Sequence, residues 1–259
     1  MALLEVDRVS KSFGGLLAVS SVTFSVHAGQ IKALIGPNGD GKTTIFNLLS
    51  GIESVTSGTI FFDGCDITRS PSHVIARLGL SRTFQTVRLF GRMTVLQNVM
   101  VGRHCRSRSE VLATGLLFPR ALREEREIAE KSMEILRFVG LEHRSNERAS
   151  DLPYGQQRLL ELARSLATEP RLLLLDEPAA GLNDAETAVL SDLIHLVREK
   201  GVTILLVEHD MGLVMDISDE VMVLDHGEKI AEGPPDTVTN DERVIEAYLG
   251  GGLKSAPTR

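Results

Sequence analysis

The stretch IGPNGDGKTT, residues 35–44, holds the residues of this chain best suited to binding phosphate. Gly36 to Thr43 match the spacing G-x-x-x-x-G-K-[ST], in which successive backbone N–H groups point at nucleotide phosphates. Lys42 would reach the terminal phosphates, and the Thr43 hydroxyl would hold Mg²⁺. A random chain of this length matches on the order of 1% of the time. The stretch therefore predicts a phosphate loop, and the nucleotide would contact Gly36, Pro37, Asn38, Gly39, Asp40, Gly41, Lys42, Thr43 and Thr44.

A pair of carboxylates, Asp176 and Glu177, ends the apolar run RLLLLDEP. A buried strand with this ending would place both groups at the carboxyl edge of a sheet, where α/β folds bind ligands. Asp176 would bind Mg²⁺ through water, and Glu177 would polarise the attacking water. Acidic pairs are also common in solvated turns, so the functional interpretation rests on their combination with the phosphate loop.

The elements that would position these groups follow from the pattern of apolar residues. Near the N-terminus, three runs predict strands: LLEVDRV, SVTFSV and IKALIG. The third leads directly into the glycine loop, and TTIFNLLSG after it has helical apolar spacing. Strand, glycine-rich loop and helix in this order are what a phosphate loop requires. SGTIFFDGCDI predicts a further strand and turn.

Later segments predict a parallel sheet with helical cover. RLLLLDEP and VTILLVEHD have continuous apolar runs, which are typical of strands buried on both faces. EVMVLDHGEKIAEG predicts a hairpin that turns at residues 225–227, and the tail from residue 250 predicts a loose end. A long helix is predicted within REEREIAEKSMEILRFVGL, and we interpret its apolar stripe as a packing face formed by Ile128, Ser132, Ile135, Leu136 and Val139.

Composition narrows the class of protein. The chain has 259 residues, 42% of them hydrophobic and 24% charged, as in soluble globular proteins. Its net charge of −7 argues against a nonspecific nucleic-acid binder. Cys65 and Cys105 offer no disulfide framework or metal cluster and indicate reduced thiols. Apolar runs stay well below the ~18 residues of a membrane span, so we expect a cytosolic chain unless a partner holds it at a membrane.

The segment LPYGQQRLLELARSL, shortly before RLLLLDEP, resembles the signature motif of the ATP-binding-cassette ATPases. Further motifs of that family then fall into order along nearly the whole chain. The resemblance implies an α/β fold: a P-loop NTPase (RecA-like) core, a small antiparallel β region and an inserted helical subdomain. It divides one nucleotide-binding domain into core and β region (1–93 and 159–240), helical subdomain (94–158), and C-terminal helix with tail (241–259).

The same resemblance implies roles for single residues. Phe13, in KSFGG, matches the aromatic residue that stacks on adenine. Gln85, in RTFQ, matches the glutamine that contacts Mg²⁺ and the attacking water, and His209, in LLVEHD, matches the histidine that grips the γ-phosphate. The signature residues would contact the ATP of a second subunit: Pro153, Tyr154, Gly155 and Gln156. The implied catalytic residues are Glu177, His209, Gln85 and Lys42, and the implied Mg²⁺ ligands are Thr43, Gln85 and Asp176.

Three positions depart from the pattern of many family members. Pro153 replaces a serine whose hydroxyl contacts the γ-phosphate, but proline is tolerated at a helix start, so we expect an active enzyme with a weaker contact. Asn183 replaces an aspartate and keeps its hydrogen-bonding capacity without its charge. Asp40 replaces a small residue, and its side chain is expected to face away from the phosphates. No positive role is predicted for it.

Within the family, RTFQTVRLFGRMTVLQNVMVGRH, DEPAAGLN and the ending VIEAYLG resemble the ATPase subunits of branched-chain amino-acid importers. The resemblance implies a homodimer, or a heterodimer with a second such ATPase, enclosing two ATP molecules with Mg²⁺. It also implies membrane permease subunits, docked near residues 87–101, and indirectly an extracytoplasmic solute-binding protein. The chain would lie at the cytoplasmic face of the inner membrane, and no nucleic acid is expected.

Several alternatives stay open at this point. Related importers of urea, amides or other amino acids share much of the pattern, and so does a lipopolysaccharide-type exporter ATPase. A soluble cassette ATPase of translation or DNA maintenance is a further alternative, although those chains usually carry two cassettes or a very long coiled coil. A plain P-loop kinase would leave LPYGQQR unexplained.

Overall fold

The computed structural model describes residues 2–104 and 119–250. Its strands are β1 (Ala2–Phe13), β2 (Leu16–His27), β3 (Ile31–Ile35), β4 (Ser57–Phe62), β5 (Cys65–Asp66), β6 (Leu80–Arg82), β7 (Leu172–Asp176), β8 (Thr203–Val207), β9 (Glu220–Asp225) and β10 (Glu228–Gly233). Its α-helices are α1 (Lys42–Leu49), α2 (Ser72–Leu78), α3 (Val95–Arg103), α4 (Pro119–Phe138), α5 (Tyr154–Leu166), α6 (Asp184–Glu199), α7 (Met211–Ile217), α8 (Pro235–Thr239) and α9 (Glu242–Gly250). Two short 3₁₀ helices lie between α4 and α5, η3 (Glu142–Arg144) and η4 (Ala149–Asp151).

A six-stranded sheet forms the centre of the molecule, in the order β10-β9-β3-β8-β7-β6. Strand β3, which leads into the phosphate loop, pairs in parallel with both β8 and β9. Strand β7 pairs in parallel with β8, so the carboxyl ends of β3, β7 and β8 meet at one edge. All residues of these three strands are buried, which confirms the prediction of strands covered on both faces.

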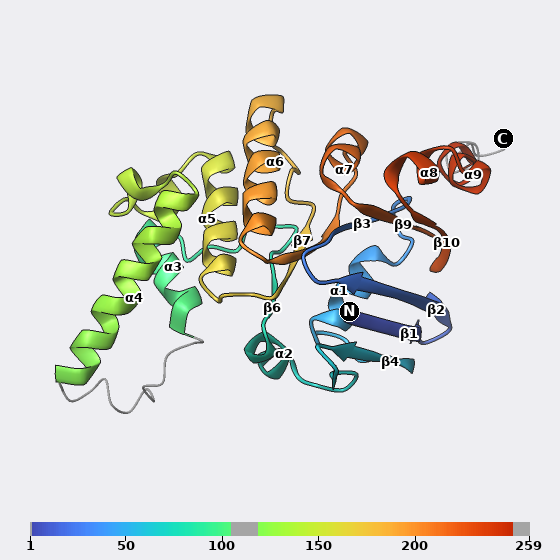
Figure 1. Cartoon of the computed structure of the whole chain (residues 1–259), viewed down its shortest axis with the longest axis horizontal. Helices are drawn as coiled ribbons and strands as arrows, with labels where there is room; N and C mark the ends of the chain where they lie inside the picture. The colour runs from blue at the N-terminus through green and yellow to red at the C-terminus, as the bar shows by residue number, and fades with distance from the viewer. Residues whose placement is uncertain (1, 105–118, 251–259) are drawn as a thin grey trace.

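Alternate residues of the central strands enter two different hydrophobic cores. Ile31, Ala33 and Ile35 face a core that includes residues of α5, α6 and α7, whereas Leu34 faces a core shared with α1 and a second sheet. That second sheet is antiparallel, in the order β2-β1-β4-β5. Figure 1 shows α3, α4 and α5 grouped on the opposite side of the molecule from β1, β2 and β4. Because side chains alternate along a strand, the short apolar runs could fill both cores at once.

The hairpin of β1 and β2 is longer than the sequence pattern predicted. Its register shifts between Val6 and Val9, where Asp7 and Arg8 are both exposed and Arg8 has φ of 45°. Such a bulge breaks the alternation of buried and exposed residues. The predicted run LLEVDRV spans this bulge and ends at Val9, whereas the strand continues through the polar residues 10–12 to Phe13.

The predicted hairpin at residues 220–233 is confirmed as β9 and β10. Its turn residues His226 and Gly227 have φ of 48° and 81°, and two successive positive φ angles are typical of a tight type I′ turn. The Ser20 N–H donates to the Gly227 oxygen at 2.8 Å, which joins the turn to β2. The turn therefore lies beside the antiparallel sheet.

The long predicted helix is α4, and the predicted stripe packs as expected. Four of its residues are buried, and Ile135 is half-buried; the four are Ile128, Ser132, Leu136 and Val139. Cys65 is an exposed free thiol. Cys105 and residues 251–259 of the predicted tail lie outside the described residues. In the part of the chain that the structure describes, every helix is too short or too polar to cross a membrane.

Candidate functional site

The phosphate loop connects β3 to α1 through a backbone conformation that needs glycine. Gly36, Gly39 and Gly41 have φ of 148°, 94° and 92°. A Cβ atom on Gly36 would lie 2.1 Å from the Leu224 oxygen, and one on Gly41 would lie 2.4 Å from the Ala18 oxygen. Both contacts are with backbone and cannot be relieved by a change of rotamer. The glycines of the motif are therefore needed for packing as well as for phosphate access.

Lys42 lies over the loop that it follows. Its Nζ donates to the Gly36 oxygen at 2.7 Å and to the Pro37 oxygen at 2.6 Å. Burial lowers the pKa of Lys42 from its ordinary value, and the negative charges of Asp40 and Glu177 oppose that effect. The ammonium group is thus already placed at the loop, held by two carbonyl oxygens that a phosphate could replace.

A cavity of about 220 Å³ brings the predicted catalytic groups together. It is lined by Asn38, Gly39, Gly41, Lys42, Thr43, Thr44, Gln85, Glu177 and His209. Four segments far apart in the sequence therefore meet at the carboxyl edge of the central sheet, as expected for an α/β ligand site. Asp40 does not line this cavity, in keeping with the prediction that its side chain faces away.

Glu177 is the centre of the hydrogen bonds in this cavity. The Gln85 Nε2 donates to its Oε2 at 3.0 Å, and the His209 Nε2 lies 3.0 Å from its Oε1. The backbone of Glu177 has φ of 47°, which is unusual for a residue with a side chain. Strain of this kind costs on the order of 1–3 kcal/mol and is concentrated at functional sites. The carboxylate is therefore fixed in a strained turn, with one partner on each oxygen.

Asp176 lies deeper than Glu177 and has a partner that the motifs did not predict. The Arg82 Nη2 donates to Asp176 Oδ2 at 2.8 Å, and both side chains are buried. Arg82 Nη1 also donates to Asn47 Oδ1 at 2.7 Å. The sequence offered one indication that Arg82 belongs to the site, which is its position three residues before Gln85. The pair fixes Asp176 at the end of β7, outside the lining of the 220 Å³ cavity.

Glu208, just before His209, was also missed. Its Oε1 accepts the Ala179 N–H at 2.7 Å, and its Oε2 accepts the His209 N–H at 2.9 Å. Burial raises the pKa of Glu208, and these backbone hydrogen bonds offset part of the rise. One carboxylate thus joins the turn after β7 to the turn after β8. The sequence indicated Glu208 only as an acidic residue directly after the apolar residues of β8.

Phe13 ends β1 and is 43% exposed. The Lys11 Nζ lies 4.7 Å from the centre of its ring, which is a cation–π distance. Further along the same hairpin, Ala18 contacts the phosphate loop at Gly41. The ring is therefore exposed on the hairpin that flanks the loop. Its role in binding adenine stays a prediction.

The signature residues lie at the start of α5, away from the phosphate cavity of their own chain. Pro153 is the N-cap of α5, and the exposed Tyr154 begins the helix. Pro153, Tyr154, Gly155 and Gln156 are all absent from the lining of the 220 Å³ cavity. A role at ATP would therefore require a second subunit, as the resemblance implied.

Arg158, one turn into α5, connects the signature segment to the catalytic loops. Its guanidinium donates to the Phe84 oxygen at 3.2 Å and to the Gln85 oxygen at 2.8 Å. It also donates to the Ala180 oxygen at 3.4 Å. Arg158 is buried, and one cation therefore binds the loop of Gln85 and the turn after Glu177 to one helix. The motif comparison did not single it out.

Two further side chains of α5 hold the segment that follows Gln85. The Arg88 N–H donates to Glu161 Oε1 at 3.4 Å, and Arg164 Nη1 donates to the Arg88 oxygen at 2.5 Å. Burial raises the pKa of Glu161, with Arg158 and Arg164 among the groups that oppose the rise. The irregular residues 84–88 therefore depend on α5 for their position.

Comparisons with known proteins agree with this geometry. The family model described as ABC transporter matches residues 19–180, and the model described as Branched-chain amino acid ATP-binding cassette transporter matches residues 228–254. The high-affinity branched-chain amino acid transport ATP-binding protein BraF of Pseudomonas aeruginosa is 48% identical over 96% of this chain and 98% of its own length. The corresponding protein LivG of Escherichia coli is 45% identical with the same coverage.

A more distant relative and solved structures extend the similarity. A probable branched-chain amino acid transport ATP-binding protein LivG of Archaeoglobus fulgidus is 38% identical over 96% of each chain. The crystal structure of an ATP-binding cassette of an ABC transporter in its ADP conformation has a TM-score of 0.85 and 33% identity, with 96% of this chain and 99% of that chain covered. A nucleotide-free cassette has a TM-score of 0.84 at 32% identity, with the same coverage.

Proposed function

Because the chain belongs to the ABC transporter family of ATP-binding proteins, we propose that it is the ATP-hydrolysing subunit of an importer for branched-chain amino acids. Family membership confirms the prediction from the motifs, and the relatives named above favour import over export or a soluble role. The convergence of Lys42, Gln85, Glu177 and His209 on one 220 Å³ cavity is the observation that carries the proposal.

In this proposal the chain's own residues bind and activate the reactants. The loop N–H groups and Lys42 bind the phosphates, and Glu177 accepts a proton from the attacking water. Gln85 and His209 orient that carboxylate, since each contacts one of its oxygens at 3.0 Å. His209 is then placed to contact the γ-phosphate as well.

Mg²⁺ fits the donor atoms that the cavity offers. Thr43 supplies a hydroxyl oxygen and Gln85 an amide oxygen, and Mg²⁺ prefers oxygen ligands. Asp176 would act through water, because its carboxylate is held by Arg82. The ion would neutralise charge that develops on the phosphates.

Dimerisation completes the proposed site. The signature residues at the start of α5 would approach the ATP of a second subunit, identical or related. The N–H groups at this helix end are suited to an anion because Pro153 is the N-cap and the helix dipole is positive there.

A membrane permease would receive the motion of the dimer, and an extracytoplasmic solute-binding protein would deliver the solute to it. We propose residues 87–101 as part of the docking surface. A hollow of about 270 Å³ nearby is lined in part by Ile52, Ile75 and Phe84, and Ile52 is exposed. Arg158 and Glu161 link residues 84–88 to the signature helix, so that displacement of one would move the other. The chain would then lie at the cytoplasmic face of the inner membrane, bound through its partners.

Replacement of Glu177 with Gln tests the proposed mechanism. Glutamine keeps the size of the side chain and one acceptor oxygen but cannot accept the proton of water, so ATP turnover should fall on the order of 10²–10⁴-fold. ATP binding should persist, and ATP should shift the variant toward a dimer. Phosphate release, fluorescent-ATP binding and size-exclusion chromatography measure the three results.

Lys42→Ala is the matched control, since it should lose most nucleotide affinity and fail to dimerise with ATP. Normal turnover by the Glu177→Gln variant would contradict the role of Glu177. Unchanged ATP affinity in Lys42→Ala would contradict the assignment of the phosphate loop.

A further inference from the structure

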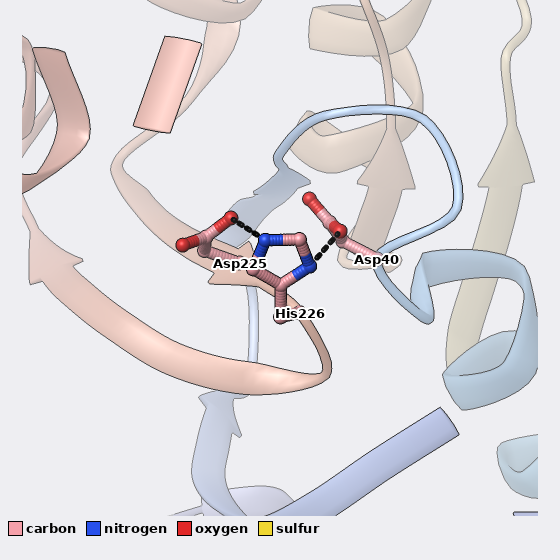
Figure 2. Close-up of side chains that lie close together, drawn as sticks. All are labelled: Asp40, Asp225 and His226. Carbon is pink, nitrogen blue, oxygen red and sulfur yellow. Dashed lines mark ion pairs between the residues drawn. The ribbon is translucent and has the colours of Figure 1, made fainter. Parts of the chain in front are cut away.

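A second cavity, of about 740 Å³, lies on the side of the phosphate loop toward the β9–β10 turn. Asp40, Asp225 and His226 line it together with residues of α9. Figure 2 shows the His226 imidazole between the two carboxylates, with one at each ring nitrogen. The Nδ1 atom lies 3.7 Å from Asp40 Oδ1, and the Nε2 atom lies 3.9 Å from Asp225 Oδ1. These three side chains do not take part in the chemistry proposed above.

Asp40 is the least satisfied member of this cluster. Its side chain is 6% exposed, and its Oδ2 is buried without a hydrogen-bond partner among the described residues. A buried carboxylate oxygen without a donor is costly, by about 1–3 kcal/mol or more for a charged group. His226 is 86% exposed, and its ion pair with Asp40 is with the other oxygen, Oδ1. The Asp40 carboxylate therefore lines an open cavity, and a positive ion bound there would stabilise it.

The types and spacing of the ligand atoms favour a metal ion. One ligand atom from each of Asp40, Asp225 and His226 lies within 4.8 Å of the other two. Imidazole nitrogen with carboxylate oxygen is the ligand set of divalent transition metals such as Zn²⁺ and Co²⁺. The open cavity supplies water for the remaining positions, and Arg243, the cation on its wall, is held by Asp241 at 2.8 Å.

We propose that Asp40, Asp225 and His226 bind a divalent transition-metal ion of the zinc class. The ion would join the phosphate loop to the β9–β10 turn, since Asp40 lies between Gly39 and Gly41, and His226 begins the turn. It would also neutralise the carboxylate beside Lys42, whose charge faces Asp40. This site is separate from the Mg²⁺ position in the 220 Å³ cavity, whose lining includes none of the three ligands.

Zinc titration of the full-length, tag-free protein tests the proposal. Calorimetry in chelator-treated buffer without nucleotide should give one Zn²⁺ site per chain. Asp40→Ala and His226→Asn should each weaken binding on the order of tenfold or more, because each removes a ligand. Asparagine tolerates the positive φ of position 226, so the turn should remain folded. His143→Ala, at an exposed histidine in η3, is the matched control and should bind like the parent.

Cobalt supplies a second, independent measurement. Co²⁺ bound to the parent protein should give visible absorption bands that the His226→Asn variant lacks. Absence of Zn²⁺ binding by the parent, or equal binding by the parent and both ligand variants, would overturn the proposal. Because nucleotide is absent throughout, these results do not depend on the proposed ATPase activity.

Discussion

The backbone and the side chain of Asp40 contribute to two different sites. Its backbone belongs to the loop, whereas its side chain lines the cavity beside His226. The charge still acts on the phosphate side, because it opposes the burial effect on the pKa of Lys42. The Asp40 side chain therefore affects the ATP site through its charge and not through a contact with the phosphates.

Asp40→Ala should tighten ATP binding. At an assumed ~8 Å between charges, repulsion costs about 0.5 kcal/mol in water and about 2 kcal/mol at an effective dielectric near 20. The gain should be largest at low salt, where screening is weakest. Fluorescent-ATP titrations of parent and variant at two salt concentrations, with transition metals removed, measure it. A severe loss of affinity would mean that Asp40 makes a direct contact in the nucleotide complex.

The motifs predicted which residues lie together, but not the charged residues that hold the surrounding loops. Lys42, Glu177 and His209 meet in one cavity as the motifs predicted. Arg82, Arg158 and Glu208 were missed because their partners are reached through the fold: a buried aspartate, three loop carbonyls and two loop N–H groups. A sequence shows a charged residue beside a motif, but not the distant groups that the fold brings to it.

At the scale of the elements, the start of helix α6 accounts for Asn183, in the turn after Glu177. Asn183 is its N-cap: the side chain accepts the Glu186 N–H at 3.0 Å, and the Glu186 side chain accepts the Asn183 N–H at 3.1 Å. This reciprocal pair is a capping box. The residue that departs from the family pattern thus still begins the helix.

Asn183→Ala should lower the free energy of unfolding by about 1 kcal/mol, because the cap is lost. Asn183→Asp is the matched variant and should keep the stability, since aspartate caps as well as asparagine. Urea unfolding followed by circular dichroism gives both values. Equal stability of Asn183→Ala and the parent would show that the capping box contributes nothing measurable.

Strands and helices were predicted from the sequence where they are long enough to show a regular pattern of apolar residues. Strands β7 and β8 and helix α4 have uninterrupted patterns and were found. Strand β6 spans three residues, Leu80–Arg82, which is too short to show a period. Strand β1 was predicted only as far as Val9, because residues 10–12 that continue it are all polar and show no apolar alternation.

At the scale of the whole molecule, Glu208 should make global stability depend on pH. Burial raises its pKa above the ordinary 4.5, so the folded chain binds the proton more tightly than the unfolded chain. Its contribution to stability is complete below pH 4.5 and is lost as pH rises through the folded pKa. The slope is at most about 1.4 kcal/mol per pH unit for one proton.

Glu208→Gln isolates this contribution from those of other groups. The free energy of unfolding of the parent minus that of the variant should fall as pH rises from 4.5, and should level off above the folded pKa. Denaturant unfolding over a pH series measures the difference. A constant difference across the series would contradict a raised pKa in the folded state.

The central place of β3 in its sheet has a consequence for biosynthesis. Strand β3 ends at Ile35, whereas its two neighbours begin at Thr203 and Glu220. At translation rates of about 5–20 residues per second, β3 leaves the ribosome on the order of ten seconds before a partner strand is available. The local hairpin of β1 and β2 can form early, but the phosphate loop cannot be fixed until nearly the whole chain has been made. Nascent or truncated chains should therefore be unable to hydrolyse ATP before they are complete.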